Sequence, residues 1–246
     1  CLIYHEADWL DFLFTAGFTI AVGSGLSFIR PSTSSMGKRE GFLLTAMVWI
    51  VFSLFGMIPF MLMDREPLSV SDAFFEAMSG FTTTGATIMV SVDHLSHGAM
   101  LWRSLMQWIG GMGIILFTLA VVPMLNSSGG MQMFNAEVTG ITHDKLRPRI
   151  SQTAKSLWLI YTVLTLVLFG LLYLGPMEGF DALCYSLAVM STGGFATSDS
   201  GLSLWNSDYI EAVVTIFMFL GGVSFTLIYR AVHREFRAVW NNDVFR

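Results

Sequence analysis

Residues 79–87 read SGFTTTGAT and follow directly on the apolar, acidic run SVSDAFFEAM at 69–78. This threonine-rich stretch is too polar and too glycine-rich to continue a helix. It also contains no charge, histidine or cysteine that would suggest catalysis. The question is what a threonine–glycine loop does in a chain as hydrophobic as this one.

The composition is that of a membrane protein. Of the 246 residues, 54% are hydrophobic and only 13% are charged, whereas about a quarter of a soluble domain is charged. Five apolar stretches approach or exceed the ~20 residues that cross a hydrocarbon core; they cover 9–29, 41–63, 99–125, 156–174 and 209–229. Two shorter ones, at 72–81 and 180–190, would extend only ~15 Å as helices and are predicted to be re-entrant. The sequence therefore predicts an all-α integral membrane fold.

Charges in the connections predict the orientation. Basic residues follow the first, third and fifth stretches: Arg30, Lys38, Arg39; Lys145, Arg147, Arg149, Lys155; Arg230, Arg234, Arg237 and Arg246. Acidic residues dominate the opposite connections: Asp64, Glu66, Asp72, Glu76, Asp93, Glu178, Asp181, Asp199 and Asp208. By the positive-inside rule the basic side is cytoplasmic. We therefore expect the N-terminus outside, the C-terminus cytoplasmic, and both half-length helices, with Ser71, Asp72 and Asp181 at their starts, entering from outside.

An internal repeat links the two half-length segments. DAFFEAMSGFTTTGAT (72–87) aligns with DALCYSLAVMSTGGFA (181–196) at an offset of 109, which places Thr83 on Thr192 and Gly85 on Gly194. Glycine pairs, Gly110-Gly111 and Gly221-Gly222, recur in the following spans and are expected to pack against the half-helices. The predicted divisions are 1–40 (an extra helix and cytoplasmic loop), 41–126 (first repeat), 127–155 (cytoplasmic connection), 156–232 (second repeat) and 233–246 (cytoplasmic tail, predicted to be truncated).

The two loops have the chemistry of a cation filter. Non-helical backbone at membrane depth is tolerated only where protein shields it or where it lines a watery path. Backbone carbonyls in such a position can replace the water shell of a potassium ion, and the C-terminal dipoles of the half-helices favour a cation there. The cores of the two predicted filter loops are Thr84-Gly85-Ala86 and Gly193-Gly194-Phe195. Potassium is the expected ion and substrate, with no covalent cofactor.

Four runs carry a resemblance to a known family: FFEAMSGFTTTGAT, LWRSLMQWIGGMGIILF, VVPMLNSSGGMQMF and MSTGGFATSD. They resemble the Trk/Ktr/HKT superfamily of potassium transporters, and within it most closely the bacterial Trk potassium-uptake membrane subunits. The resemblance implies four span–pore-helix–span repeats arranged like the subunits of a potassium channel, of which this chain holds half. It places the filter glycines at Gly85 and Gly194, and it adds Thr83 and Thr192 to the filter, with the carbonyls of Thr83, Thr84, Thr192 and Gly193 as ion ligands. Plant relatives that prefer sodium carry serine at the first of these, so Gly85 favours potassium.

The resemblance also implies surroundings and partners. It implies potassium uptake across the bacterial inner membrane by a multi-pass protein in lipid. It further implies a homodimer in which each subunit has its own pore, and a cytosolic nucleotide-binding regulatory subunit, for which 127–149 is a candidate contact. Because two loops cannot form a fourfold ring, the chain is either a fragment, which we favour, or one of two chains that pair to complete a pore.

Other features leave alternatives open. Arg103 either tunes cation entry at the outer vestibule or forms a structural pair with Glu76 or Asp93, and Glu76 is open to the same two interpretations. His94 and His97 lack a third metal ligand nearby and are interpreted as loop residues.

A rival function is a coupled secondary transporter of a small solute, or of sodium with potassium. No span presents a nucleophile–base pair, so we expect no enzyme, and the glycine pairs follow no strand, so we expect no nucleotide site; nucleic acid is not an expected partner.

Overall fold

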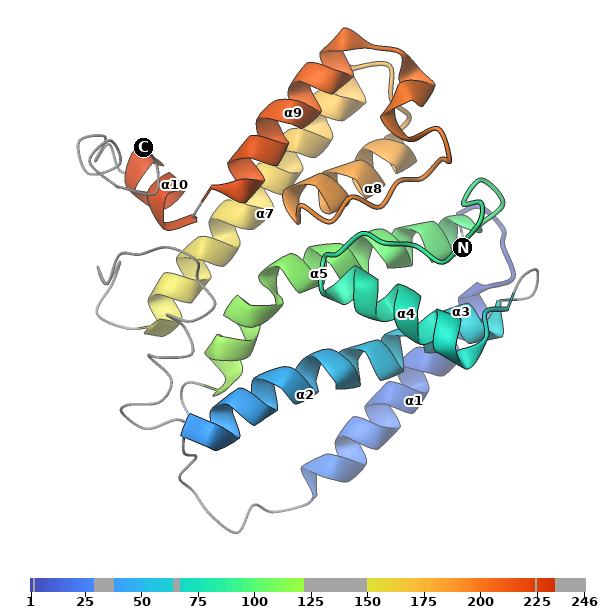
Figure 1. Ribbon diagram of the computed structural model, residues 1–246, viewed down its shortest axis with the longest axis vertical. Coiled ribbons are helices and arrows are strands. Elements are labelled where there is room, and N and C mark those ends of the chain that lie inside the picture. Colours follow the sequence, from blue (N-terminus) through green and yellow to red (C-terminus); the bar gives the residue numbers. More distant parts are fainter. Residues whose placement is uncertain (2, 29–37, 64–66, 122–149, 224, 233–246) are drawn as a thin grey trace.

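The computed structural model describes residues 1, 3–28, 38–63, 67–121, 150–223 and 225–232, which lie in helices and loops with no strand among them. The helices are α1 (Trp9–Ser27), α2 (Lys38–Gly56), α3 (Ile58–Leu62), α4 (Val70–Phe81), α5 (His97–Val121), α7 (Ile150–Leu174), α8 (Gly179–Met190), α9 (Asp208–Gly222) and α10 (Phe225–Val232), with a 3₁₀ turn at Gly201–Trp205 (Figure 1). The basic segments that predict a cytoplasmic side lie largely outside these residues, as does the connection at 127–149.

The two half-length helices are present where the sequence predicts them. Helices α4 and α8 each contain 12 residues, which corresponds to about 18 Å, or roughly half a bilayer. The cap of α4 differs from the prediction, because its side-chain oxygen comes from Ser69 and not Ser71: the amide of Asp72 donates to Ser69 Oγ over 3.3 Å. Ser69 has the extended backbone of an N-cap residue, which places Ser71 inside the first turn.

Two of the five predicted spans are interrupted. The second divides into α2 and α3, and Pro59, which has no amide hydrogen to continue the helical bonding, lies in the first turn of α3. The fifth divides into α9 and α10, because Val223 is extended, with φ −78° and ψ 141°. The fourth span begins at Ile150, six residues before the predicted start. The second and fifth predicted spans therefore each consist of two shorter helices.

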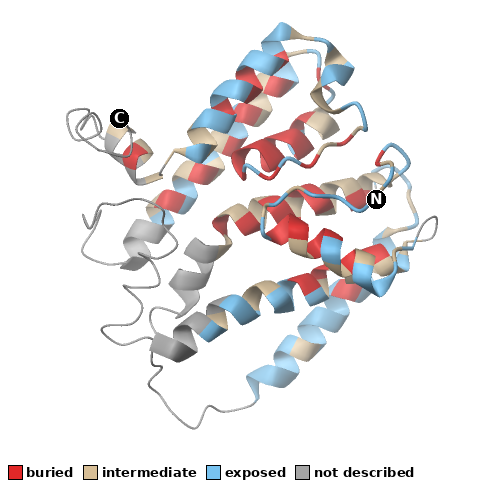
Figure 2. Cartoon of the chain, in the orientation of Figure 1, coloured by how far each residue is buried: buried red, intermediate tan, exposed pale blue. Residues whose placement is uncertain are grey.

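Two helices within the described residues combine the length and the apolar composition needed to cross a membrane. They cover Trp9–Ser27 and Lys155–Leu174, with shorter apolar helical stretches at Ala46–Leu62 and Gly179–Met190. Thr15 is the buried residue of α1, and large apolar side chains along this helix are exposed (Figure 2). Exposed apolar surface of this kind suits lipid as a solvent.

Helix α5 lies between the two half-helices and packs against both α4 and α8 (Figure 1). One buried cluster belongs to the first repeat and includes Phe60, Phe81 and Met106. A second, larger cluster joins α7, α8 and α9 and begins on α5 at Met112. Between them, Tyr161 on α7 donates to the carbonyl of Trp108 on α5 over 3.1 Å. A span of the first repeat thus supports the half-helix of the second.

Candidate ion-binding site

The loops that follow α4 and α8 have the same backbone conformation. Positive φ occurs at Thr83 (55°) and Thr192 (54°), and again two residues later at Gly85 (76°) and Gly194 (84°). Both pairs are separated by the offset of 109 residues. A left-handed residue other than glycine is uncommon, so Thr83 and Thr192 make the shared conformation of the two aligned loops a specific one.

Hydrogen bonds close the two helix ends in matching ways. In the first loop the amides of Thr83 and Thr84 donate to Gly80 and Ser79 over 3.1 and 2.9 Å. In the second, the amides of Thr192 and Gly193 donate to Val189 and Ala188 over 3.0 and 2.9 Å. These bonds satisfy carbonyls at the ends of the half-helices and hold each loop against its own helix.

Six carbonyl groups in these loops accept no hydrogen bond from any described residue: those of Thr83, Thr84, Gly85, Thr192, Gly193 and Gly194. The flanking carbonyls differ. Ser79 Oγ donates to the carbonyl of Ala86 over 2.5 Å, and Arg103 Nη1 donates to that of Ala196 over 3.4 Å. Of the eight predicted filter residues, Ala86 therefore has its carbonyl engaged by the protein, while Phe195 is buried with its amide bonded to Gln107.

The structure brings the two loops into contact. A Cβ atom at Gly85 would overlap the carbonyl oxygen of Gly193. Gly85 therefore lacks a side chain for two reasons: its positive φ, and the approach of the second loop. Gly85 and Gly193, which are 108 positions apart in the sequence, thus lie in direct backbone contact.

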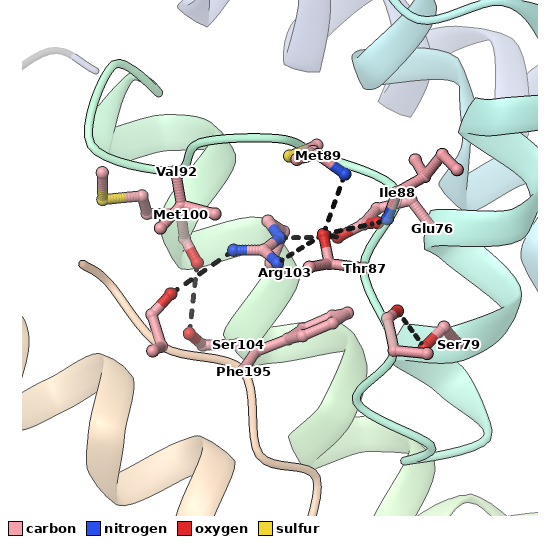
Figure 3. Close-up of polar contacts among 12 residues, drawn as sticks. Glu76, Ser79, Thr87, Ile88, Met89, Val92, Met100, Arg103, Ser104 and Phe195 are labelled. Atoms are coloured by element: carbon pink, nitrogen blue, oxygen red, sulfur yellow. Dashed lines mark hydrogen bonds and ion pairs between the residues drawn. The ribbon is translucent and has the colours of Figure 1, made fainter. Parts of the chain in front are cut away.

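A buried ion pair lies behind this surface (Figure 3). Arg103 on α5 is 2% exposed, Glu76 on α4 is fully buried, and Arg103 Nε donates to Glu76 Oε1 over 2.8 Å. Glu76 also accepts from the hydroxyl of Thr87 and from the amide of Ile88, each over 3.0 Å. The guanidinium carbon of Arg103 lies 4.1 Å from the centre of the Phe195 ring. The pair therefore contacts the residues that follow each loop, Thr87 and Ile88 after the first and Ala196 after the second.

A second contact joins the two repeats beyond the loops. The amide of Val92 donates to Asp199 Oδ1 over 2.7 Å, and the amide of Asp199 donates to Asp93 Oδ1 over 2.9 Å. The Ser91 hydroxyl and the Val92 amide lower the pKa of Asp199 below its ordinary value. Asp93, one of the two predicted partners of Arg103, thus binds Asp199.

The histidines of the HLSH motif are not arranged as a metal site. His97 begins α5, its Nδ1 lies 2.8 Å from Glu6 Oε1, and its ring stacks on Tyr4 with centroids 3.7 Å apart. No cluster of three or more His, Cys, Asp or Glu residues suited to a metal ion occurs in the described part of the chain. Burial of Glu6 opposes its ionisation, but hydrogen bonds from His97 and Gly98 outweigh this effect and lower its pKa.

Gly110 and Gly221 pack against the ends of the half-helices as predicted, whereas Gly222 does not. A Cβ atom at Gly110 would overlap the carbonyl of Phe81 at the end of α4, and one at Gly221 would lie 3.2 Å from the carbonyl of Met190 at the end of α8. These contacts let each span approach the end of its half-helix closely. Gly222 has open space around it.

Sequence reasoning missed Gln107 as a contact of the second loop. Gln107 is fully buried, and its Oε1 accepts from the amide of Phe195 over 3.1 Å. The available indication was a carboxamide in the middle of an apolar span, one turn from Arg103. Such a group normally needs a partner, although the sequence does not name it.

Comparisons with known proteins agree with this architecture. The family model "TrkH: Cation transport protein" matches residues 11–243. The Trk system potassium uptake protein TrkH of Escherichia coli K12 is 38% identical over 248 residues, covering 100% of this chain and 51% of the relative. TrkG of the same organism is 33% identical, covering 95% and 48% respectively.

Among solved structures, the crystal structure of the potassium transporter TrkH from Vibrio parahaemolyticus superposes with a TM-score of 0.78 at 33% identity, covering 94% of this chain and 46% of that one. The chain spans about half the length of the curated relatives it matches. Family match, sequence identity and backbone agree, and this all-helical membrane chain belongs to the TrkH family of cation transport proteins.

Proposed function

We propose that this chain supplies two segments of a potassium-selective filter in a pore for potassium uptake. The observation that carries the proposal is the set of six unbonded carbonyls in two touching loops of equal backbone conformation. A dehydrated potassium ion binds several carbonyl oxygens at once. Carbonyls that accept no bond from the protein are available for that purpose.

The backbone conformation supports this assignment. In an extended strand, successive carbonyls point to opposite sides. Positive φ at every second residue, as at Thr83 and Gly85, removes that alternation and lets neighbouring carbonyls lie on one side of the chain. We therefore assign Thr83, Thr84, Gly85, Thr192, Gly193 and Gly194 as ion ligands, and Ala86 and Phe195 as flanking residues.

Electrostatics favour a cation at the loops without a formal charge there. The C-terminal end of a helix carries roughly half a negative charge, and α4 and α8 both end at the loops. The nearby charges of Glu76 and Arg103 neutralise each other. We propose that this pair has the structural role, holding the loops from behind, and does not tune cation entry.

The proposal extends to the setting implied by the family. It places the protein in the bacterial inner membrane with the N-terminus of this chain outside, as a homodimer with a cytosolic nucleotide-binding regulatory subunit. A fourfold ring needs two more filter segments, from further repeats of the same chain or from a second copy. The reading frame on both sides of residues 1 and 246 distinguishes these sources.

Rubidium uptake tests the function. The complete reading frame is expressed in cells that lack their own potassium systems, and we expect saturable uptake that potassium inhibits more strongly than sodium. Gly194→Ala introduces strain alone, since nothing lies within 4 Å of the new methyl group. Left-handed alanine costs ~1–2 kcal/mol, which lowers the ratio of filter to relaxed loop conformations by roughly 5- to 30-fold. We therefore expect uptake to fall by at most that factor.

Gly170→Ala is the matched control. Gly170 also has nothing within 4 Å but lies in α7, where alanine is the better helix former, so uptake should be retained. Absence of rubidium uptake in the unmodified protein, or equal uptake by both variants, would refute the filter. Rubidium uptake that requires sodium would favour coupled transport, and exchange of an organic solute without cation conductance would favour the other rival.

A further inference from the structure

Gln107 lies where one repeat touches the filter loop of the next. It is on α5, in the first repeat, but its carboxamide lies against residues 193–195 of the second. A Cβ atom at Gly193 would overlap this carboxamide group. The side chain is fully buried, so its position is determined by the packing around it.

The hydrogen bond from Phe195 to Gln107 determines the direction of a carbonyl. The amide of Phe195 and the carbonyl of Gly194 belong to one peptide group, and no cis peptide occurs among the described residues. In a trans peptide the N–H and the C=O point in opposite directions. With the N–H directed at Gln107 on α5, the Gly194 carbonyl is directed away from α5.

Glycine alone would not hold this direction. Gly194 has a positive φ, and no described atom lies within 4 Å of the position that a Cβ atom would occupy, so no contact there restrains the peptide from rotating. The bond to Gln107 Oε1 is the side-chain contact that fixes the peptide within the described residues. In the first loop the corresponding restraint is different, because Ser79 holds the carbonyl of Ala86.

We propose that Gln107 is a positioning residue of the filter and thereby a determinant of potassium over sodium selectivity. The inference rests on the proposed function. Selectivity depends on the number and field strength of the carbonyl dipoles around the ion. If the Phe195 amide loses its acceptor, the peptide can turn, and the Gly194 carbonyl leaves the ring.

The test compares two substitutions at position 107 whose side chains are close to glutamine in size. The complete protein is expressed in cells that lack their own potassium systems. Gln107→Met fills the same space without an acceptor. Gln107→Glu retains the acceptor oxygen and replaces Nε2, which makes no hydrogen bond in the described structure. Burial favours the neutral, protonated form of a carboxyl group at this position, so the comparison adds no charge beside the filter. Ser104→Ala is the matched control, since the Ser104 hydroxyl is also buried on α5 but donates to Met100 of the same helix.

The measured quantity is the ratio of rubidium to sodium uptake, normalised to the amount of protein in the membrane. A general loss of folded protein lowers both rates and leaves the ratio unchanged. We expect Q107M to lower the ratio about tenfold, equivalent to about 1.4 kcal/mol. Q107E and S104A should keep the ratio within about threefold of the unmodified protein, a difference of under ~1 kcal/mol.

The possible results separate the role of Gln107 from the proposed filter function. An unchanged ratio in Q107M, with normal uptake by the unmodified protein, would overturn the role of Gln107 and leave the proposed function intact. Equal loss in Q107M and Q107E would also overturn it. No cation uptake by the unmodified protein would overturn the function and the inference together. If Q107M does not reach the membrane, Gly193→Ala, which displaces an unchanged Gln107 from behind the loop, should lower the same ratio.

Discussion

Breaking the buried ion pair between α4 and α5 should destabilise the protein strongly. Arg103→Met leaves the Glu76 carboxylate buried with two remaining donors, the Thr87 hydroxyl and the Ile88 amide. Removing one partner of a buried pair costs about 3–5 kcal/mol, because the other charge is left uncompensated. The two surviving donors place the expected loss near the lower end, at about 3 kcal/mol.

A double-mutant cycle isolates the pair. Glu76→Gln keeps the shape of the side chain but leaves the guanidinium of Arg103 without a counter-charge, in contact with the Thr87 hydroxyl, the Ala196 carbonyl and the Phe195 ring. The double variant Glu76→Gln/Arg103→Met contains neither charge, so neither is left uncompensated. We expect it to lose less stability than the sum of the two single variants, by about 2–3 kcal/mol.

The assay is equilibrium unfolding of the purified, detergent-solubilised protein by denaturant at neutral pH, which gives a free energy of unfolding for each variant of the cycle. Arg103→Lys is the matched control: it keeps the charge without the planar fork and should fall between the unmodified protein and Arg103→Met. If losses in the double variant simply add, or if Arg103→Met is as stable as the unmodified protein, the ion pair does not hold the loops.

Two further predictions concern helix packing and pH. Gly110→Ala places a methyl group against the backbone carbonyl of Phe81, which cannot move aside as a side chain can, so we expect the free energy of unfolding to fall by about 1–3 kcal/mol. Gly170→Ala is the control and should be neutral or stabilising, and equal stability of the two variants would contradict the packing of Gly110 on Phe81. The hydrogen bonds from the Ser91 hydroxyl and the Val92 amide lower the pKa of Asp199 in the folded state, so they stabilise the protein at pH values above the ordinary pKa of 3.8. This stabilisation is lost as the pH falls through the lowered pKa. Asp199→Asn should therefore differ from the unmodified protein at pH 6 and approach it in acid, and a pH-independent difference would exclude this linkage.

The elements that the sequence predicts well are those with strong local patterns. Helices α4 and α8 lie within two residues of the predicted segments, because apolar runs of this length end where threonine and glycine begin. The interruption between α9 and α10 was not predictable, since the apolar run continues through Gly222 and Val223 without a proline. Hydropathy records where apolar residues occur but not where the backbone changes direction.

The candidate site was predictable in its composition but not in its supports. The repeat alignment placed Gly85 and Gly194 at equivalent positions, and the backbone angles agree. Helical periodicity places Arg103 and Gln107 on one face of α5 without identifying what that face contacts. Their partners, Glu76 and Phe195, are 27 and 88 residues away in the sequence. Contacts at such separations arise only from the packing of α5 between the half-helices.

This packing also accounts for the one ligand position at which the two loops carry different residues, Thr84 against Gly193. The Thr84 side chain is exposed, and its hydroxyl lies 2.8 Å from that of Thr82, so a side chain is accommodated there. At Gly193 the same space holds the carboxamide of Gln107. A threonine at 193 would displace Gln107, and a glycine at 84 would lose the Thr82 contact. The duplicated loops therefore differ in sequence because their neighbours differ, while the backbone that presents the carbonyls stays the same.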